Sequence, residues 1–398
     1  MATRSLYLFT DRNLVLLAAV MIVQSAMAAS IFPYLSIIAT QSFGLSEQIF
    51  ALALGLGTLA SLSGSFYLGI RTDQTGNRRF WALTLAVIYL SGNALMTFAP
   101  SIPGYLLTHG ALIPIGGGII GLLYAETRVQ VQAWEPRARD LVMSEVRMVF
   151  AVPFVVAPII WGLLIGSGVE PTSIYPVQFV LSIVQLVSVV LVWPKGTPPL
   201  ADAPARDFWK DASVLLERRV LLPVSLLIVI SMGPMAFMVN LGLLFEAVPN
   251  RNIGEVGLYS ATIAALEVPM MILLPRMLIN VRKSRQITVG AIGYTTFLFL
   301  LPLTADSWFV WLLCPLAGAS AAIILAVPIG YIQDLLSDRP GAASFLGSVV
   351  AISGSIVAAV IIAIGATYLS IYWITVISGF TVAFAAGLFF ISTRDQGL

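Results

Sequence analysis

The side chain most likely to do chemistry by its position is Glu267, a carboxylate near the middle of a long apolar segment. The sequence around it reads Ala264-Ala-Leu-Glu-Val-Pro269. A charged carboxylate at the centre of a bilayer costs at least about 2.5 kcal/mol. Because burial disfavours the charged form, we expect Glu267 to bind and release a proton and so to couple proton movement to another process. Hydrogen bonding to a substrate, or to a neighbouring helix beside a kink at Pro269, is the alternative.

A second group of functional side chains lies between Gly69 and Arg79, in the stretch Gly-Ile-Arg-Thr-Asp-Gln-Thr-Gly-Asn-Arg-Arg. Gly69 lets neighbouring helices approach closely, and Gly76 permits a tight turn. Asp73 can accept hydrogen bonds from a helix N-terminus or pair with an arginine in one conformation. Together with Arg78, these residues predict a gating loop between two helices. An ordinary basic loop is the alternative.

Further polar side chains lie in or beside apolar segments. Four of them predict a charge network at the cytoplasmic ends of the helices: Glu126, Glu145, Arg147 and Asp334. Seven polar and aromatic residues predict a substrate cavity: Gln24, Tyr34, Phe237, Asn240, Trp311, Tyr331 and Gln333. Such side chains either cross-link helices or line a wet cavity, so packing is the alternative for each. The lone histidine, His109, is expected to be neutral and packed in the core.

Several kinds of chemistry are excluded by what the sequence holds. It has one His and one Cys, so no metal cluster and no intramolecular disulfide are expected. An enzyme would place clustered His, Asp or Ser–Lys residues at one membrane face, and this sequence has no such cluster, so we expect no enzyme activity. No cofactor is expected beyond a proton gradient. The net charge of +2 does not indicate binding to nucleic acid.

The elements that must position these residues are long apolar segments. The chain of 398 residues is 59% hydrophobic and 10% charged, against roughly 25% charged residues in soluble domains. About 20 apolar residues span a bilayer. The predicted spans are 13–39, 46–69, 80–99, 103–125, 142–166, 174–193, 220–246, 255–278, 286–304, 307–332, 341–366 and 370–392. The sequence therefore predicts an all-α polytopic membrane protein with 12 transmembrane helices.

The Lys and Arg residues alternate between the polar breaks. The even-numbered breaks hold Arg71, Arg78 and Arg79; Arg128, Arg137 and Arg139; Lys195, Arg206, Lys210, Arg218 and Arg219; Arg276, Arg282, Lys283 and Arg285; and Arg339. The odd-numbered breaks hold only Arg251. Short basic loops stay on the cytoplasmic side. This asymmetry predicts that both termini are cytoplasmic.

The longest polar stretch divides the chain into two halves. Residues 1–193 form the predicted N-terminal six-helix half, and residues 220–398 form the C-terminal half. The stretch 194–219 is rich in Pro and mixed charge, which is typical of an extended linker. Two six-span halves joined by a cytoplasmic linker are typical of a duplicated transporter.

Several of these motifs resemble known families. The stretch from Gly69 to Arg79 resembles the G-x-x-x-D-x-x-G-x-[RK]-[RK] loop of the major facilitator superfamily. The run Tyr331-Ile-Gln-Asp334-Leu and the run Leu266-Glu-Val-Pro269 are similar to segments of its sugar efflux transporter family. That resemblance implies the major-facilitator-type fold and proton-linked export of small sugars or glycosides by alternating access.

The leading hypothesis is therefore a secondary active antiporter in the bacterial inner membrane. A proton-coupled multidrug exporter of the same fold is the first alternative, since the spans are rich in Met and aromatic residues. A membrane-embedded enzyme or scaffold is a remote alternative. The expected partners are a small-molecule substrate (sugar, glycoside or drug) and the lipid bilayer, and the expected state is a monomer.

Overall fold

The computed structural model describes residues 7–75, 77–194, 217–278, 280–336 and 340–394. These residues form helices joined by short connections, and no strand occurs within the described ranges. Gly76 and most of the predicted linker 194–219 lie outside these ranges. For Gly69 and Asp73 only the helical backbone is described.

The described residues up to Val192 form six helical segments. Their elements are α1 (Arg12–Ile31) with η2 (Phe32–Tyr34), α2 (Leu35–Ile37) and η3 (Ile38–Ser42); α3 (Glu47–Thr75); α4 (Arg78–Phe98); α5 (Ile102–Leu107) with η4 (Thr108–Leu112), α6 (Ile113–Gly116) and α7 (Ile119–Gln130); α8 (Pro136–Gly166); and α9 (Ile174–Val192). A short turn, η1 (Tyr7–Thr10), precedes α1, and another, η5 (Pro171–Ser173), precedes α9.

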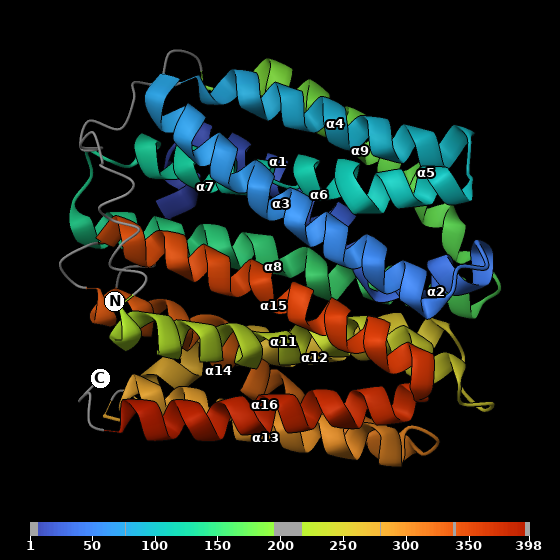
Figure 1. Ribbon diagram of the computed structural model, residues 1–398. Coiled ribbons are helices and arrows are strands. Elements are labelled where there is room, and N and C mark those ends of the chain that lie inside the picture. The colour runs from blue at the N-terminus through green and yellow to red at the C-terminus, as the bar shows by residue number, and fades with distance from the viewer. Residues whose placement is uncertain (1–6, 76, 195–216, 279, 337–339, 395–398) are drawn as a thin grey trace, which may run out of the picture.

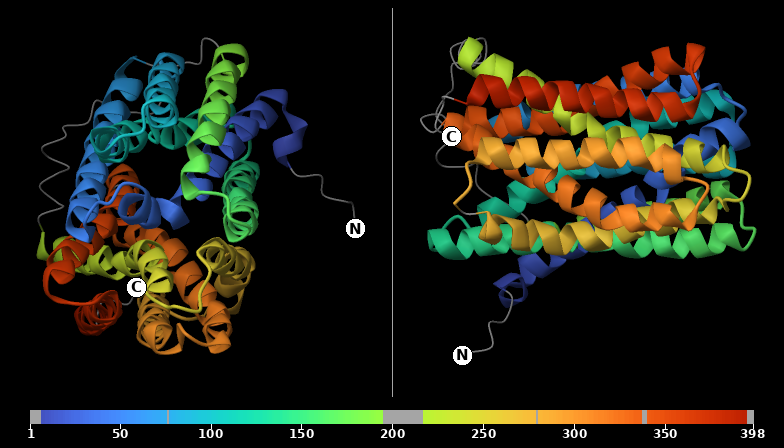
Figure 2. Two further views of the ribbon diagram at one scale, coloured as in Figure 1. Left: turned by 90° about the vertical axis from the view of Figure 1, so that its right-hand side faces the viewer. Right: turned by 90° about the horizontal axis from the view of Figure 1, so that it is seen from below.

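The described residues from Arg218 onward form the second half. Their elements are α11 (Arg218–Glu246), α12 (Gly254–Met277), α13 (Lys283–Thr304), η6 (Trp308–Leu313), α14 (Cys314–Leu335), α15 (Pro340–Tyr368) and α16 (Ile371–Thr393). The helices of each half pack mainly on one another, as α4 does on α9 and α13 on α16. Viewed end-on, the blue-to-green helices gather in one cluster and the yellow-to-red helices in another (Figure 2).

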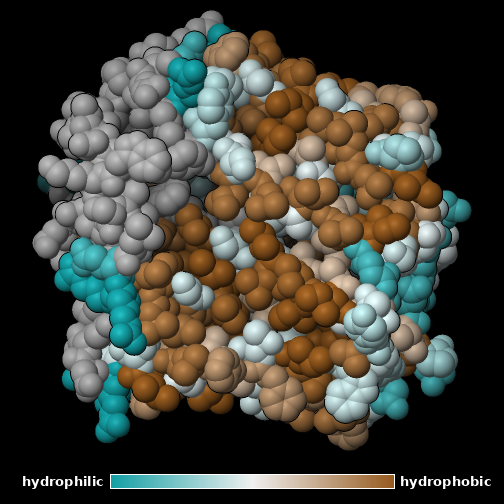
Figure 3. Space-filling model, viewed as in Figure 1, coloured by the Kyte–Doolittle hydropathy of each residue, from teal (hydrophilic) through white to brown (hydrophobic). Residues whose placement is uncertain are grey.

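Ten of the described helical segments are long and apolar enough to cross a membrane. The helices α12 and α15, with 24 and 29 residues, also have the length of a span. Apolar side chains cover the middle of the face shown in Figure 3, and hydrophilic residues gather toward its edges. The all-helical polytopic fold predicted from the sequence is confirmed.

Several helices extend past the predicted spans at the end of the bundle where the basic loops lie, and α3 and α8 do so by the most residues. The helix α3 continues to Thr75, past the predicted end at residue 69, and α8 begins at Pro136 instead of residue 142. Proline is well suited to the first turn of a helix because its missing N–H has no partner there anyway. Hydropathy alone follows the membrane thickness and so misses these polar helical turns.

The two halves meet at the end of the bundle opposite the basic loops. We call the end where α4 and α13 begin the basic end, and the opposite end the apposed end. One buried cluster joins the second half to apposed-end residues of the first half, such as Ile31, Phe50 and Trp161. A separate cluster, which includes Leu14, contains only residues of the first half and lies toward the basic end.

Two long helix pairs connect the halves: α8 with α12, and α3 with α15 (Figure 1). Two hydrogen bonds close them at the apposed end. The Gln48 side chain donates to the Ala366 carbonyl at 2.9 Å, and the Asn252 side chain donates to the Gly166 carbonyl at 3.3 Å. We call this contact region between the halves the seam. The structure is therefore closed at the apposed end.

Candidate functional site

Glu267 lies near the middle of α12, on a stretch that packs against α14. Its backbone approaches Gly318 so closely that a Cβ on that glycine would lie 3.1 Å from the Glu267 nitrogen. The Glu267 carboxylate is close enough to the buried Tyr294 for the two groups to interact electrostatically. Its side chain is half-buried, and it has no hydrogen bond or ion pair among the residues that the structure describes. Its role in proton exchange stays a prediction.

Two aromatic residues predicted for a cavity, Phe237 and Trp311, lie in the second half. The Phe237 ring packs edge-on against Phe297 with centroids 5.2 Å apart, and Trp311 packs edge-on against Tyr259 at 5.3 Å. Phe237 is buried, whereas Trp311 is only partly buried. These rings form one packed cluster near the apposed end of α11 and α14 and do not present a shared face to solvent.

Two more of the predicted cavity residues are buried against α16. Tyr331 is fully buried and packs edge-on against Phe389 at 5.4 Å. The Asn240 side chain is also buried and donates a long hydrogen bond of 3.4 Å to the Thr375 hydroxyl. Both side chains therefore join helices of the second half in this conformation.

Gln24 belongs to a buried polar network in the first half. Its side-chain carbonyl accepts a hydrogen bond of 2.6 Å from Gln185, which joins α1 to α9. Nearby, Asn93 donates to the Ser182 hydroxyl at 2.8 Å, and Gln178 donates to the Met27 carbonyl at 2.9 Å. The prediction that Gln24 faces a cavity is not met in this conformation, because its amide is used to cross-link helices.

Of the seven predicted cavity residues, Gln333 alone is exposed, and it lies on α14 near the basic end. The next residue, Asp334, forms an ion pair of 2.7 Å with Lys283 at the start of α13. The Lys283 ammonium also donates to the Gly330 carbonyl at 3.1 Å. The structure does not bring the seven side chains to one surface, so their substrate role stays a prediction.

The predicted charge network divides into separate contacts at the basic end. Glu126 near the end of α7 pairs with Arg78 at the start of α4 at 3.8 Å, and both side chains are almost fully buried. Gln130 donates to the same carboxylate at 2.9 Å. Glu145 accepts a hydrogen bond of 2.7 Å from the Leu8 backbone. These contacts lie in the first half, whereas the Asp334 pair lies in the second.

The two ion pairs occupy equivalent positions in the two halves. Arg78 begins α4 and Glu126 lies in the last turns of α7, just as Lys283 begins α13 and Asp334 lies in the last turn of α14. Sequence analysis placed Arg78 in the gating loop and Glu126 in the charge network and did not pair them, because sequence separation hides such a pair.

Local contacts hold three further residues that the sequence analysis singled out: Arg79, Arg147 and His109. Arg79 donates to the Val190 carbonyl at 2.8 Å and so fixes the start of α4 against α9. Arg147 is exposed on α8, close enough to Tyr124 of α7 to interact electrostatically. His109 is buried and shares a hydrogen bond of 2.8 Å with the Tyr175 hydroxyl. Its surroundings agree with the expected packed core histidine.

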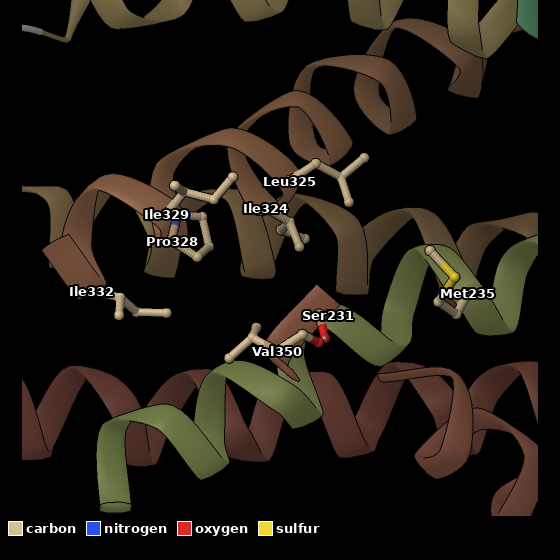
Figure 4. Close-up of a pocket in the computed structure, with 8 residues that line it drawn as sticks. All are labelled: Ser231, Met235, Ile324, Leu325, Pro328, Ile329, Ile332 and Val350. Atoms are coloured by element: carbon tan, nitrogen blue, oxygen red, sulfur yellow. Dashed lines mark hydrogen bonds between the residues drawn. The ribbon is translucent and has the colours of Figure 1, made fainter. Parts of the chain in front are cut away.

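An apolar cavity of about 40 Å³ lies between α11, α14 and α15 (Figure 4). Its lining residues are Ser231, Met235, Ile324, Leu325, Pro328, Ile329, Ile332 and Val350. The Ser231 hydroxyl is occupied, because it contacts the carbonyls of Ile228 and Val350 at 2.8 and 2.9 Å. The cavity is apolar, and it is much smaller than the roughly 300 Å³ at which ligand pockets begin. Sequence analysis did not find it, because its residues have no motif.

One functional-looking cluster that the sequence analysis passed over surrounds Arg251 at the apposed end. Its guanidinium donates to the Ala305 and Ser307 carbonyls and pairs with Glu255 at 2.5 Å. The Arg251 side chain also lies over the Phe245 ring at 5.3 Å. These contacts hold in place the connection between α11 and α12, which contains Asn252 at the seam. Its signal in the sequence was its isolation as the only basic residue in an odd-numbered break.

We predict that Glu126→Ala destabilises the protein by about 3–5 kcal/mol, because it leaves the Arg78 charge buried without its carboxylate. Thermal unfolding in detergent measures the change. Asp334→Ala is the matched control, and it should cost no more than about 1 kcal/mol because the Lys283–Asp334 pair is partly exposed to solvent. Equal losses in the two variants would contradict the structural role of the buried pair.

Comparison with known proteins places this geometry in a family. The sequence profile of the Major Facilitator Superfamily matches residues 15–358. The solved structure of the nucleoside transporter NupG superposes with a TM-score of 0.79 at 12% identity, covering 96% of this chain and 100% of that chain. An auto-inhibited peptide transporter of the POT family superposes with a TM-score of 0.74 at 14% identity, covering 97% of each chain. No curated protein sequence matches the chain. The chain is a transporter of small molecules, not an enzyme, and it belongs to the Major Facilitator Superfamily.

Proposed function

We propose that the protein is a proton-coupled exporter of small sugars or glycosides that works by alternating access. The basic end faces the cytoplasm in this proposal, because short Lys- and Arg-rich loops stay on that side. The apposed end then faces outward, and the closed seam corresponds to an inward-facing state. In a bacterium the protein would lie in the inner membrane.

The observation that carries the proposal is the unpaired Glu267. By contrast, the carboxylates of Glu126 and Asp334 lie in ion pairs with Arg78 and Lys283. A half-buried carboxylate without such a partner can be stabilised in its neutral form by protonation. Proton uptake from one side and release to the other would link the proton gradient to the movement of a solute.

The substrate class rests on the resemblance to the sugar efflux transporter family around Glu267 and Gln333. Gln333 is exposed at the basic end, where a cytoplasmic solute would enter. The superposed structures are described as nucleoside and peptide transporters, but at 12–14% identity they support the fold alone. In the same proposal Asp73 acts as a gate where the basic ends of the halves must come together.

A multidrug exporter of the same fold is the second candidate, and the observation that favours it is the abundance of Met and aromatic residues in the apolar segments. Resistance assays separate the two candidates. Expression of the protein should protect cells against toxic sugar analogues under the leading proposal, and against cationic dyes under the alternative.

We predict opposite labelling of two asparagines that flank α12. Asn250 is exposed at the apposed end, and Asn280 is exposed at the basic end. A membrane-impermeant maleimide added outside intact cells should label Asn250→Cys and should reach Asn280→Cys only after the membrane is permeabilised. Cys314→Ala removes the background thiol. The reverse pattern would contradict the proposed orientation.

We predict that Glu267→Gln abolishes accumulation driven by a pH gradient, because the amide mimics a permanently protonated carboxylate. Solute exchange without a gradient should persist, since it needs no net proton movement. Proteoliposomes loaded with a panel of glycosides and placed in an imposed pH gradient measure both activities. Accumulation at the wild-type rate in the variant would place the proton site elsewhere.

The matched control for this experiment is Asp306→Asn. Asp306 is an exposed carboxylate in the connection between α13 and η6, outside the helices that span the membrane. Its amide variant should keep gradient-driven accumulation. A loss of both exchange and accumulation in Glu267→Gln would assign Glu267 to binding of solute hydroxyls, and the coupling role would be rejected.

A further inference from the structure

Two hydroxyl groups of the first half are pressed against two glycines of the second half at the seam. The Tyr34 hydroxyl, in η2, lies at Gly257 of α12, where a Cβ would overlap with it. The Ser36 hydroxyl, in α2, lies at Gly242 of α11, where a Cβ would be 2.7 Å from the oxygen. The two contacts involve different helices of the second half, α12 and α11.

Neither hydroxyl makes a hydrogen bond of good geometry with a described residue, although the Tyr34 oxygen lies beside the Gly257 backbone. Tyr34 is 0% exposed and Ser36 is 2% exposed, and both oxygens are shielded from any water-sized space. Most buried hydroxyls in this bundle have a partner, as Tyr105 has in the Leu35 carbonyl at 2.9 Å. A buried hydroxyl without a partner opposes the state that buries it.

The glycines explain how the seam closes over these hydroxyls. At Gly242, a side chain would also meet Ile37 at 3.0 Å, so the backbone of α11 can approach α2 only without a Cβ. The helix pair beside it follows the same rule, since a Cβ on Gly162 of α8 would lie 2.7 Å from the Gly254 carbonyl of α12. Close backbone packing of this kind stabilises helix contacts in membranes.

We propose that Tyr34 and Ser36 set the balance between the closed and open states of the seam. Their hydroxyls lose their hydrogen bonds when the seam closes and regain them from water when it opens. The glycine contacts and the hydrogen bonds from Gln48 and Asn252 favour closure, and the two hydroxyls oppose it. Because these effects oppose each other, the seam can still open outward in each transport cycle.

This inference rests on the proposed function only in taking the seam to open during transport. It makes Tyr34 and Ser36 positioning residues that act through the conformational equilibrium. Removing either hydroxyl should favour closure by about 5- to 150-fold, which corresponds to the cost of leaving a buried hydroxyl unsatisfied. Transport should slow in parallel, because the outward opening becomes rarer.

The test measures the seam directly and needs no solute. Spin labels at Ser167→Cys and Asn250→Cys, in a chain carrying Cys314→Ala, report the separation of α8 from the α11–α12 connection in lipid nanodiscs. Both positions are exposed at the apposed end. Gly242→Ala should add a longer distance to the distribution, because its Cβ meets the Ser36 oxygen, and so provide a mixed population.

In that Gly242→Ala background, Tyr34→Phe should return the distribution toward the short distance, because it removes an unsatisfied hydroxyl that does not meet the new Cβ. Ser182→Ala is the matched control, because it removes a buried but hydrogen-bonded hydroxyl of α9, remote from the seam, and should leave the distribution unchanged. A distribution that Tyr34→Phe leaves unchanged, or moves to longer distances, overturns the proposal. A Gly242→Ala protein that keeps only the short distance also overturns it. None of these results depends on which solute is carried.

Discussion

A polar side chain inside a membrane-spanning bundle has no water to bind, so its hydrogen-bond partner must come from another helix. The first half of this protein meets that constraint with amide and hydroxyl side chains that join α1, α4 and α9. Gln24 pairs with Gln185, Asn93 with Ser182, and Gln178 with the Met27 carbonyl. Each link would be left unsatisfied if its helices separated. The half is therefore built to move as a unit.

Exceptions to this constraint occur inside the halves, as at the side-chain oxygens of Asn93, Gln178 and Gln185, and also at the seam. Glu267 has no described partner near the middle of α12, and the Tyr34 and Ser36 hydroxyls have none at the seam. A polar group without a partner in one conformation is stabilised by any change that supplies one. Under the proposals above, that change is the binding of a proton for Glu267 and the arrival of water for the two hydroxyls.

The sequence predicts the helices well because hydropathy and the spacing of basic loops report on the membrane. It identifies the unusual Glu267 for the same reason, since a carboxylate is conspicuous in an apolar segment. It does not predict which polar side chains face each other. Gln24 and Gln185 are far apart in the chain, and whether Gln24 faces a cavity or another helix depends on the rotation of α1. The glycines at the seam have no special spacing in the sequence. Their close contacts with the other half can be seen only once the positions of both halves are known.

The two equivalent ion pairs differ in a way that bears on how the halves can move. Arg78–Glu126 is almost fully buried, so separating its partners would cost several kcal/mol, because both charges stay away from water. Lys283–Asp334 is partly exposed, so water can replace either partner at little cost. Rearrangement at the basic end is therefore easier in the second half, beside the exposed Gln333. The two halves thus carry ion pairs at equivalent positions, and the difference in burial makes the first pair harder to separate than the second.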